Sequence, residues 1–201
     1  MVLPPTYRRR RGRAAARVAA LVAATMLAVL AAACAEDGSD DPGLFEPGDS
    51  MPTGITVTST SFDPGHPVPE RFSCEGDNVP PPLSWTGVPP GTSELALAIE
   101  DPDAPDGTFV HWLVVGIDPG STGLRGTGPP GGGEVLPGSS DNATYIGPCP
   151  PNDDGIHRYL FEVYALREPP ALGTVTTPVA KVRAIRRAAA AGGLLIGTFT
   201  R

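Results

Sequence analysis

The chain of 201 residues carries 15 basic and 22 acidic side chains, and its first 33 residues differ in kind from the rest. Six basic residues and no acidic residue lie in that first stretch, so the remaining nine basic residues face all 22 acids and give a net charge of about −13. A charge of this sign repels phosphate backbones and excludes nucleic-acid binding as a main function.

Residues 1–33 have the pattern of a secretory signal sequence. Arginines at 8–13 precede an apolar run at 18–33, which is shorter than the ~20 residues that a spanning helix needs. Cys34 follows three alanines and resembles the lipid-modified cysteine of the bacterial lipobox, although Ala31 stands where that pattern prefers Leu or a branched residue. We predict lipidation of Cys34 and attachment to the extracytoplasmic face of the cell membrane. Ordinary secretion and an uncleaved anchor are the alternatives.

A tether follows the predicted cleavage position. Residues 34–53 are rich in acid, Gly, Pro and Ser and contain little to bury, which predicts a flexible linker. Residues 54–201 are then long enough for one domain with its own core.

Five short segments rich in β-branched and aromatic residues predict strands. They lie at residues 54–62, 94–100, 109–117, 158–166 and 194–200. The connections between them contain many prolines, as at 75–93, and cannot be helical. The pattern predicts a mainly β domain with antiparallel strands.

One helix is predicted near the C-terminus. Thr177 is a suitable N-cap, Pro178 suits the first turn, and Gly192 lies at the expected end. Its apolar residues share one stripe, which leaves the basic residues on a solvated outer face. The glycine-rich stretch 126–140 lacks the features of a phosphate-binding loop and predicts a mobile loop.

Two of the three histidines stand at the start of apolar strands. Strand alternation puts His111 and Leu113 on one face and Trp112 on the other, and it places His157 beside Tyr159. Each could be a core-edge histidine bonded to a backbone carbonyl, or a functional group at the rim of a pocket.

Two aspartates precede the first of these strands. Asp101 and Asp103 lie in an extended stretch that Pro102 and Pro105 keep out of helical conformations. Such aspartates make turns by accepting hydrogen bonds from their own backbone. They could also orient a histidine or accept hydrogen bonds from a ligand.

These residues resemble the phosphatidylethanolamine-binding protein family, in its bacterial Raf-kinase-inhibitor-like branch. The resemblance covers residues 54–201 and rests on "DPDAP" at 101–105 with "HW" at 111–112, on "GPCPP" at 147–151 with "HRYLFEVYAL" at 157–166, on "FSCEGDNVPPPLSW" at 72–85, and on the ending "LLIGTFTR". It implies a β-sandwich-like fold with a large central antiparallel sheet and a helix in the C-terminal region. It also implies a small pocket for phosphate-type anions or phospholipid headgroups, with no cofactor and no metal.

The expected ligand-binding residues are Asp101, Asp103, Pro105, His111, Pro150, Pro151, His157 and Tyr159. In that pocket the aspartates would orient donors and the histidines would supply them.

The sequence departs from the family at two places. Many relatives have an asparagine at the position of Gly116, and eukaryotic members often end in a further regulatory helix that we do not expect after Arg201. Kinase regulation is therefore not carried over. Outside the cytoplasm Cys74 and Cys149 favour a disulfide, with separate packing of the two thiols as the alternative.

The predicted function is a lipid-anchored, non-enzymatic protein that binds a small anion. Inhibition of a protease or kinase through the pocket rim is the main alternative, and the acidic charge would favour a basic partner. A hydrolase is a weaker alternative because no nucleophile motif is present and Ser139–Ser140 lies in the glycine-rich loop. A metal site built from Asp101, Asp103, His111 and His157 is another. His66 is expected to be a loop residue with no assigned role.

Overall fold

The computed structural model describes residues 50–201, and the predicted signal sequence, Cys34 and linker residues 34–49 lie outside this part. Within residues 50–201 no helix has the length and apolar character needed to cross a membrane. The described residues begin close to the end of the predicted linker. Met51 already packs beside the helix of the domain, and the Thr53 carbonyl accepts a hydrogen bond from the Gly192 amide at 3.3 Å.

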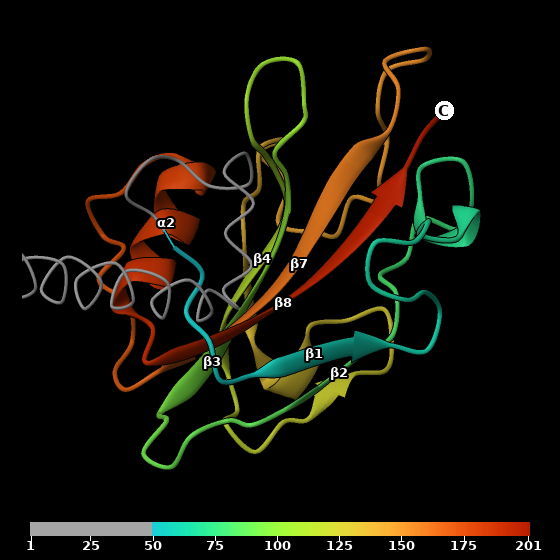
Figure 1. Cartoon of the computed structure of the whole chain (residues 1–201). Helices are drawn as coiled ribbons and strands as arrows, with labels where there is room; N and C mark the ends of the chain where they lie inside the picture. The colour runs from blue at the N-terminus through green and yellow to red at the C-terminus, as the bar shows by residue number, and fades with distance from the viewer. Residues whose placement is uncertain (1–49) are drawn as a thin grey trace, which may run out of the picture. The chain divides into compact units, whose positions relative to one another are not determined.

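The described residues form two antiparallel sheets, one α-helix and two short 3-10 helices (Figure 1). The large sheet has the order β6 (Glu134–Leu136), β4 (Phe109–Ile117), β3 (Glu94–Asp101), β7 (His157–Leu166) and β8 (Ala191–Phe199). The small sheet has the order β1 (Thr56–Ser59), β2 (Leu83–Thr86) and β5 (Gly123–Leu124). The helices are η1 (Glu70–Phe72), η2 (Pro130–Gly132) and α2 (Pro178–Ala188).

The large sheet is the middle layer of the domain, with a core on each face. On one face Phe161 packs in a cluster with Val57 and Trp85 of the small sheet. On the other face residues of β3, β4 and β7 pack against Val182 and Ile185 of α2. Because both faces are covered, β3 and β7 are buried along almost their whole length instead of alternating between buried and exposed positions.

The predicted mainly β antiparallel fold is confirmed. All five predicted strands are present, the one at 109–117 with the predicted bounds and the other four with shifted ends. The predicted helix is also present. Its N-cap Thr177 accepts a hydrogen bond from the Ala180 amide at 3.3 Å. The predicted helix end at Gly192 was wrong, because the helix stops at Ala188 and Gly192 belongs to β8.

Glycine at position 193 of β8 lets the backbone before β1 lie close to this strand. A Cβ on Gly193 would lie 2.3 Å from the Ile55 carbonyl oxygen, so a larger residue would push the N-terminal segment off the sheet.

Three short strands escaped the sequence analysis. β2 lies inside the proline-rich connection 75–93, β5 consists of only two residues, and β6 with η2 lies inside the glycine-rich stretch predicted as a mobile loop. That prediction was wrong for residues 130–136, since β6 pairs along β4 with Leu136 opposite Leu113. Strands of two to four residues are too short to show a periodic pattern.

The predicted solvated basic face of α2 was wrong at one residue. Arg186 is buried and donates hydrogen bonds to Glu100 of β3 at 2.6 Å, to Glu162 of β7 at 3.0 Å and to the Tyr164 hydroxyl at 2.9 Å. Both glutamates are buried as well. Burial raises the pKa of Glu100, and burial together with the charge of Glu100 raises the pKa of Glu162 to about 8. The helix is therefore fixed to the sheet by a buried ionic cluster as well as by apolar packing.

Candidate functional site

The candidate site lies where β3, β4 and β7 approach the loops at 102–108 and 147–156. The position of His111 in it depends on a β-bulge in β4. Trp112 pairs with Ile99 and Val110 pairs with Glu100, so His111 is an extra residue in the strand. The predicted alternation was therefore wrong in placing His111 on the face of Leu113. Its ring contacts Tyr159 on the inter-sheet side, at 5.3 Å between centroids.

His111 is a buried, neutral histidine. Burial lowers its pKa, and its Nδ1 donates a hydrogen bond to the Ile146 carbonyl at 2.9 Å. In a neutral imidazole with Nδ1 protonated, Nε2 can only accept. His111 therefore departs from the expectation that both histidines supply donors to an anion.

His157 has a carboxylate on each ring nitrogen. Its Nδ1 lies 2.8 Å from Asp101 Oδ2, and its Nε2 lies 3.2 Å from Asp154 Oδ2. Burial opposes the charged form, but the hydrogen bonds and charges of Asp101 and Asp154 outweigh it and raise the pKa of His157. The carboxylates of Asp101 and Asp154 both accept hydrogen bonds, so both ring nitrogens of His157 must carry a proton. The geometry therefore favours the imidazolium form of His157.

Asp101 fulfils both roles considered for it. It is the last residue of β3, and its Oδ1 accepts a hydrogen bond from the Asp103 amide at 2.8 Å, which shapes the turn. Its other oxygen orients His157. Asp101 is buried, with 4 % of its side chain exposed, so its charge acts through a medium of low polarity.

Asp103 is turned away from the histidines and pairs with Arg158. The guanidinium donates to Asp103 Oδ2 from Nε at 2.8 Å and to Oδ1 from Nη2 at 2.7 Å, while the Arg158 amide donates to Oδ2 at 2.8 Å. These hydrogen bonds lower the pKa of Asp103. The pair neutralises the Asp103 charge and ties the 102–108 loop to β7.

Tyr159 carries a buried hydroxyl that makes no hydrogen bond of good geometry among the described residues, although the Asp101 carboxylate and the Cys149 backbone lie close to it. Burial and the nearby charge of Asp101 raise the pKa of Tyr159, so the hydroxyl keeps its proton. An unsatisfied buried hydroxyl costs free energy unless something fills the position beside it. It is the feature of this site that points most directly to a ligand.

The prolines of the predicted site differ in exposure. Pro150 is buried, whereas Pro105 and Pro151 are exposed on the two loops. The structure thus brings Asp101, His111, His157 and Tyr159 together and leaves Pro105 and Pro151 at the surface.

A disulfide braces the loop that carries Pro150. Cys74 and Cys149 are bonded, with their Cα atoms 5.5 Å apart. The Cys74 amide also donates to the Pro148 carbonyl at 3.1 Å, and the Gly147 amide donates to Asn78 Oδ1 at 2.8 Å. The segment after η1 is therefore a fixed support for one wall of the site.

Sequence reasoning missed two charged residues of the site. Asp154 belongs to the loop at 147–156, and its only signal was its position three residues before His157. Arg158 lies between two site residues, where alternation along the strand points it to the opposite face. Its pairing with Asp103 depends on the tertiary approach of the 102–108 loop.

No cluster of three or more metal-ligating side chains occurs in the part of the chain that the structure describes. The serine considered as a nucleophile has a structural contact instead. Ser139 Oγ accepts a hydrogen bond from the Val110 amide at 2.9 Å and so fastens the 137–140 segment to β4.

Comparisons with known proteins agree with this architecture. The sequence profile described as phosphatidylethanolamine-binding protein matches residues 58–200. The chain belongs to this family. A protein of Mycobacterium tuberculosis that carries the name of a candidate lipoprotein, LppC, is 44 % identical over 145 residues, which cover 72 % of each chain.

Two solved structures show the same fold. The PEBP homologue CT736 of Chlamydia trachomatis is 31 % identical with a TM-score of 0.65, and it is matched over 74 % of this chain and 99 % of its own. YbcL of E. coli, described as a member of the mammalian PEBP family, is 28 % identical with a TM-score of 0.67 over the same shares. The family predicted from the motifs is thus confirmed.

Proposed function

We propose that this PEBP-family chain is a lipid-anchored, extracytoplasmic binding protein, and that its pocket takes a phosphate-bearing or headgroup-like anion without chemical turnover. The observation that carries the proposal is the buried Tyr159 hydroxyl, which lacks a hydrogen bond of good geometry and lies two residues from His157 on β7, with Asp101 close to both side chains. Together they offer an O–H donor and a charge-assisted N–H donor, the two kinds of group that hold a phosphate oxygen.

Support for the anchor comes from the sequence and from a relative. Cys34 follows a signal-like segment, and the relative LppC is named as a candidate lipoprotein. A cysteine with several acyl chains attaches firmly to a bilayer. The acidic residues between Cys34 and residue 50 suit a solvated tether that holds the domain away from anionic lipid.

A role without turnover fits the hydrogen bonding of the polar groups. Both nitrogens of His157 already face carboxylates, Asp103 is neutralised by Arg158, and Ser139 is bonded to the backbone. None of these groups is poised to activate water or to attack a substrate.

Asp154 occupies the His157 nitrogen that an anion would bind, so the anion must compete with its carboxylate. The charges of Asp101 and Asp154 exceed the single charge of His157, so the site as it stands carries a net negative charge. Asp154 is 42 % exposed on a loop, whereas Asp101 is buried. We therefore expect the incoming anion to replace the Asp154 carboxylate at Nε2 while Asp101 stays in place.

Calorimetric titration of the purified full-length chain with inorganic phosphate and phosphoethanolamine tests the proposal. We expect saturable binding that His157→Ala abolishes and that Asp154→Asn strengthens about tenfold, because the competing carboxylate is removed. His66→Ala is the matched control, since His66 is exposed on a loop. The proposal fails if the two anions give no saturable heat with either the natural chain or Asp154→Asn, or if His157→Ala binds as well as the natural chain.

The same titration has a defined pH dependence. Because the pKa of His157 is raised, the imidazolium persists above the ordinary histidine value of about 6.5, and anion affinity should decline only as the pH rises beyond it. His111 is neutral over this range and should contribute no pH dependence. Release of inorganic phosphate from phosphoethanolamine during a long incubation would contradict the role without turnover.

One observation favours a second candidate function, inhibition of a protease or kinase through the pocket rim. Ile156 is 70 % exposed and follows two aspartates on the loop beside His157. An apolar tip within an acidic loop suits contact with a partner that presents basic residues around an apolar recess. Ile156→Asp would abolish such inhibition and leave phosphate affinity unchanged.

A further inference from the structure

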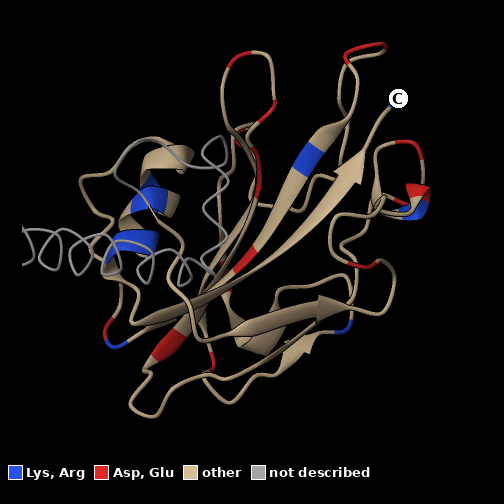
Figure 2. Ribbon diagram, viewed as in Figure 1, with Lys and Arg blue, Asp and Glu red and all other residues tan. Residues whose placement is uncertain are grey.

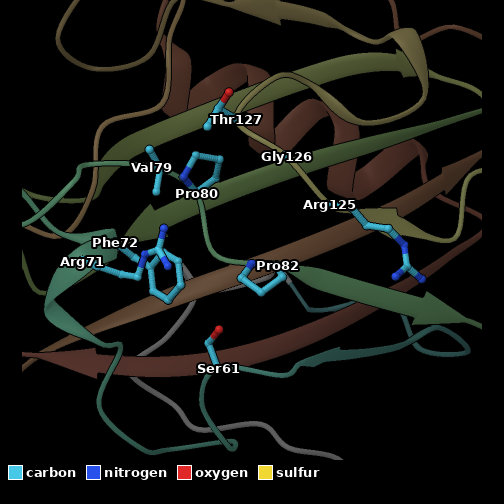
Figure 3. Close-up of a pocket in the computed structure, with 9 residues that line it drawn as sticks. All are labelled: Ser61, Arg71, Phe72, Val79, Pro80, Pro82, Arg125, Gly126 and Thr127. Atoms are coloured by element: carbon cyan, nitrogen blue, oxygen red, sulfur yellow. The ribbon is translucent and has the colours of Figure 1, made fainter.

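A cavity of about 240 Å³ lies apart from the site around His157 (Figure 3). Its walls come from the turn after β1, from η1, from the residues before β2 and from the residues after β5. The lining residues are Ser61, Arg71, Phe72, Val79, Pro80, Pro82, Arg125, Gly126 and Thr127. None of them belongs to the proposed anion pocket.

The cavity combines an apolar surface with two arginines. Phe72, Pro80 and Pro82 supply flat or rigid apolar faces. Figure 3 shows Arg71 beside Phe72 and Arg125 on the other side of Pro82, with the Arg125 guanidinium directed away from the other lining side chains. Rigid proline and aromatic walls lose little entropy when a ligand packs against them.

Arg71 lies against the aromatic wall of the cavity. Its guanidinium carbon is 5.4 Å from the centroid of the Phe72 ring, a cation–π contact that favours this position of the side chain. Its other contact is an ion pair with Asp77 at 3.3 Å, between side chains that are 65 % and 63 % exposed. An exposed pair of this kind contributes little, so a ligand anion competes for Arg71 at small cost.

Arg125 has neither an ion pair nor a hydrogen bond within residues 50–201. Basic residues are thinly spread outside α2, as Figure 2 shows, on a chain whose acids exceed its bases. Two arginines that line one cavity of such a chain make a local reversal of charge. The hydroxyls of Ser61 and Thr127 add hydrogen-bonding groups to the lining.

From these observations we infer that the cavity binds a small organic anion: a flat apolar body about the size of one aromatic ring that carries a carboxylate or phosphate. The apolar body packs on Phe72 and Pro82, and the acidic group accepts hydrogen bonds from a guanidinium, whose fork matches both kinds of acid. An inorganic anion lacks the apolar part and a neutral ring lacks the charge, so each binds weakly here. The inference does not depend on the proposed function.

Calorimetric titration of the purified full-length chain with benzoate and with phenyl phosphate tests this site. Benzyl alcohol serves as the uncharged probe and inorganic phosphate as the probe without a ring. The variants are Arg125→Ala, His157→Ala and, as a matched control for the loss of one exposed arginine, Arg167→Ala. Circular dichroism of each variant verifies that it is folded.

We expect both aromatic anions to bind saturably, with a loss of affinity of about tenfold in Arg125→Ala and none in Arg167→Ala. Binding should survive His157→Ala, which separates this cavity from the anion pocket. The inference is overturned if neither aromatic anion binds saturably, if benzyl alcohol binds as well as benzoate, if Arg125→Ala and Arg167→Ala lose affinity equally, or if His157→Ala alone abolishes binding. The last result would leave the proposed function standing.

Discussion

Replacement of Arg186 by methionine tests the buried ionic cluster beneath α2. Methionine replaces the apolar stem of arginine with an unbranched apolar side chain and removes the charge. In the natural chain one guanidinium serves two glutamates with no more than 4 % of either side chain exposed, and it also donates to the Tyr164 hydroxyl. The variant leaves the carboxyl groups of Glu100 and Glu162 buried without their cation.

The expected loss is large at neutral pH and smaller in acid. Removal of one partner from a buried ion pair costs about 3–5 kcal/mol of unfolding free energy. The pKa of Glu162 is already raised to about 8, and loss of the Arg186 charge raises it further. A raised carboxyl pKa means that the folded state holds protons that the unfolded state has released, so stability falls as the pH rises from about 4.5 to the folded pKa. At pH 5 both glutamates of the variant can bind protons, and the loss should shrink to about 1–2 kcal/mol.

Urea unfolding at pH 5 and pH 8 measures both values. Arg187→Met, on the exposed side of the same helix, is the matched control and should cost less than about 0.5 kcal/mol. A loss below about 1 kcal/mol for Arg186→Met at pH 8, or an equal loss at both pH values, would refute the reasoning.

Three other perturbations have expected outcomes. The double variant Cys74→Ser, Cys149→Ser should lower the unfolding free energy by about 2–5 kcal/mol, and reduction of the natural chain should cause the same loss. An unchanged unfolding free energy in both experiments would show that the disulfide contributes nothing to stability. Gly147→Ala should destabilise the chain by more than about 2 kcal/mol in thermal unfolding, because a Cβ there would lie 2.2 Å from the Phe72 carbonyl oxygen. A neutral result would mean that this loop is free to shift. Thr177→Ala should cost about 1 kcal/mol in urea unfolding, whereas Thr177→Ser should be close to neutral if the hydroxyl cap is the reason.

The sequence by itself determined the class of the fold and the family of the chain. Segments 94–100 and 158–166 are short runs rich in apolar and aromatic residues between turn formers, and such runs predict strands through local composition alone. Thr177 and Pro178 defined the start of the helix because capping is a local interaction. The paired motifs around His111 and His157 specified the family before any contact was known.

Tertiary structure decided what the site residues do. The bulge at His111 depends on the register between β3 and β4, so alternation along one strand could not reveal it. The pairing of Asp103 with Arg158 joins residues 55 positions apart, and the pairing of Arg186 with Glu100 joins residues 86 positions apart. Charge pairing of this kind depends on distance and burial, which a linear pattern does not contain. For the same reason only the folded chain shows that its surroundings raise the pKa of His157 and lower the pKa of His111, and that the Tyr159 hydroxyl makes no hydrogen bond of good geometry within residues 50–201.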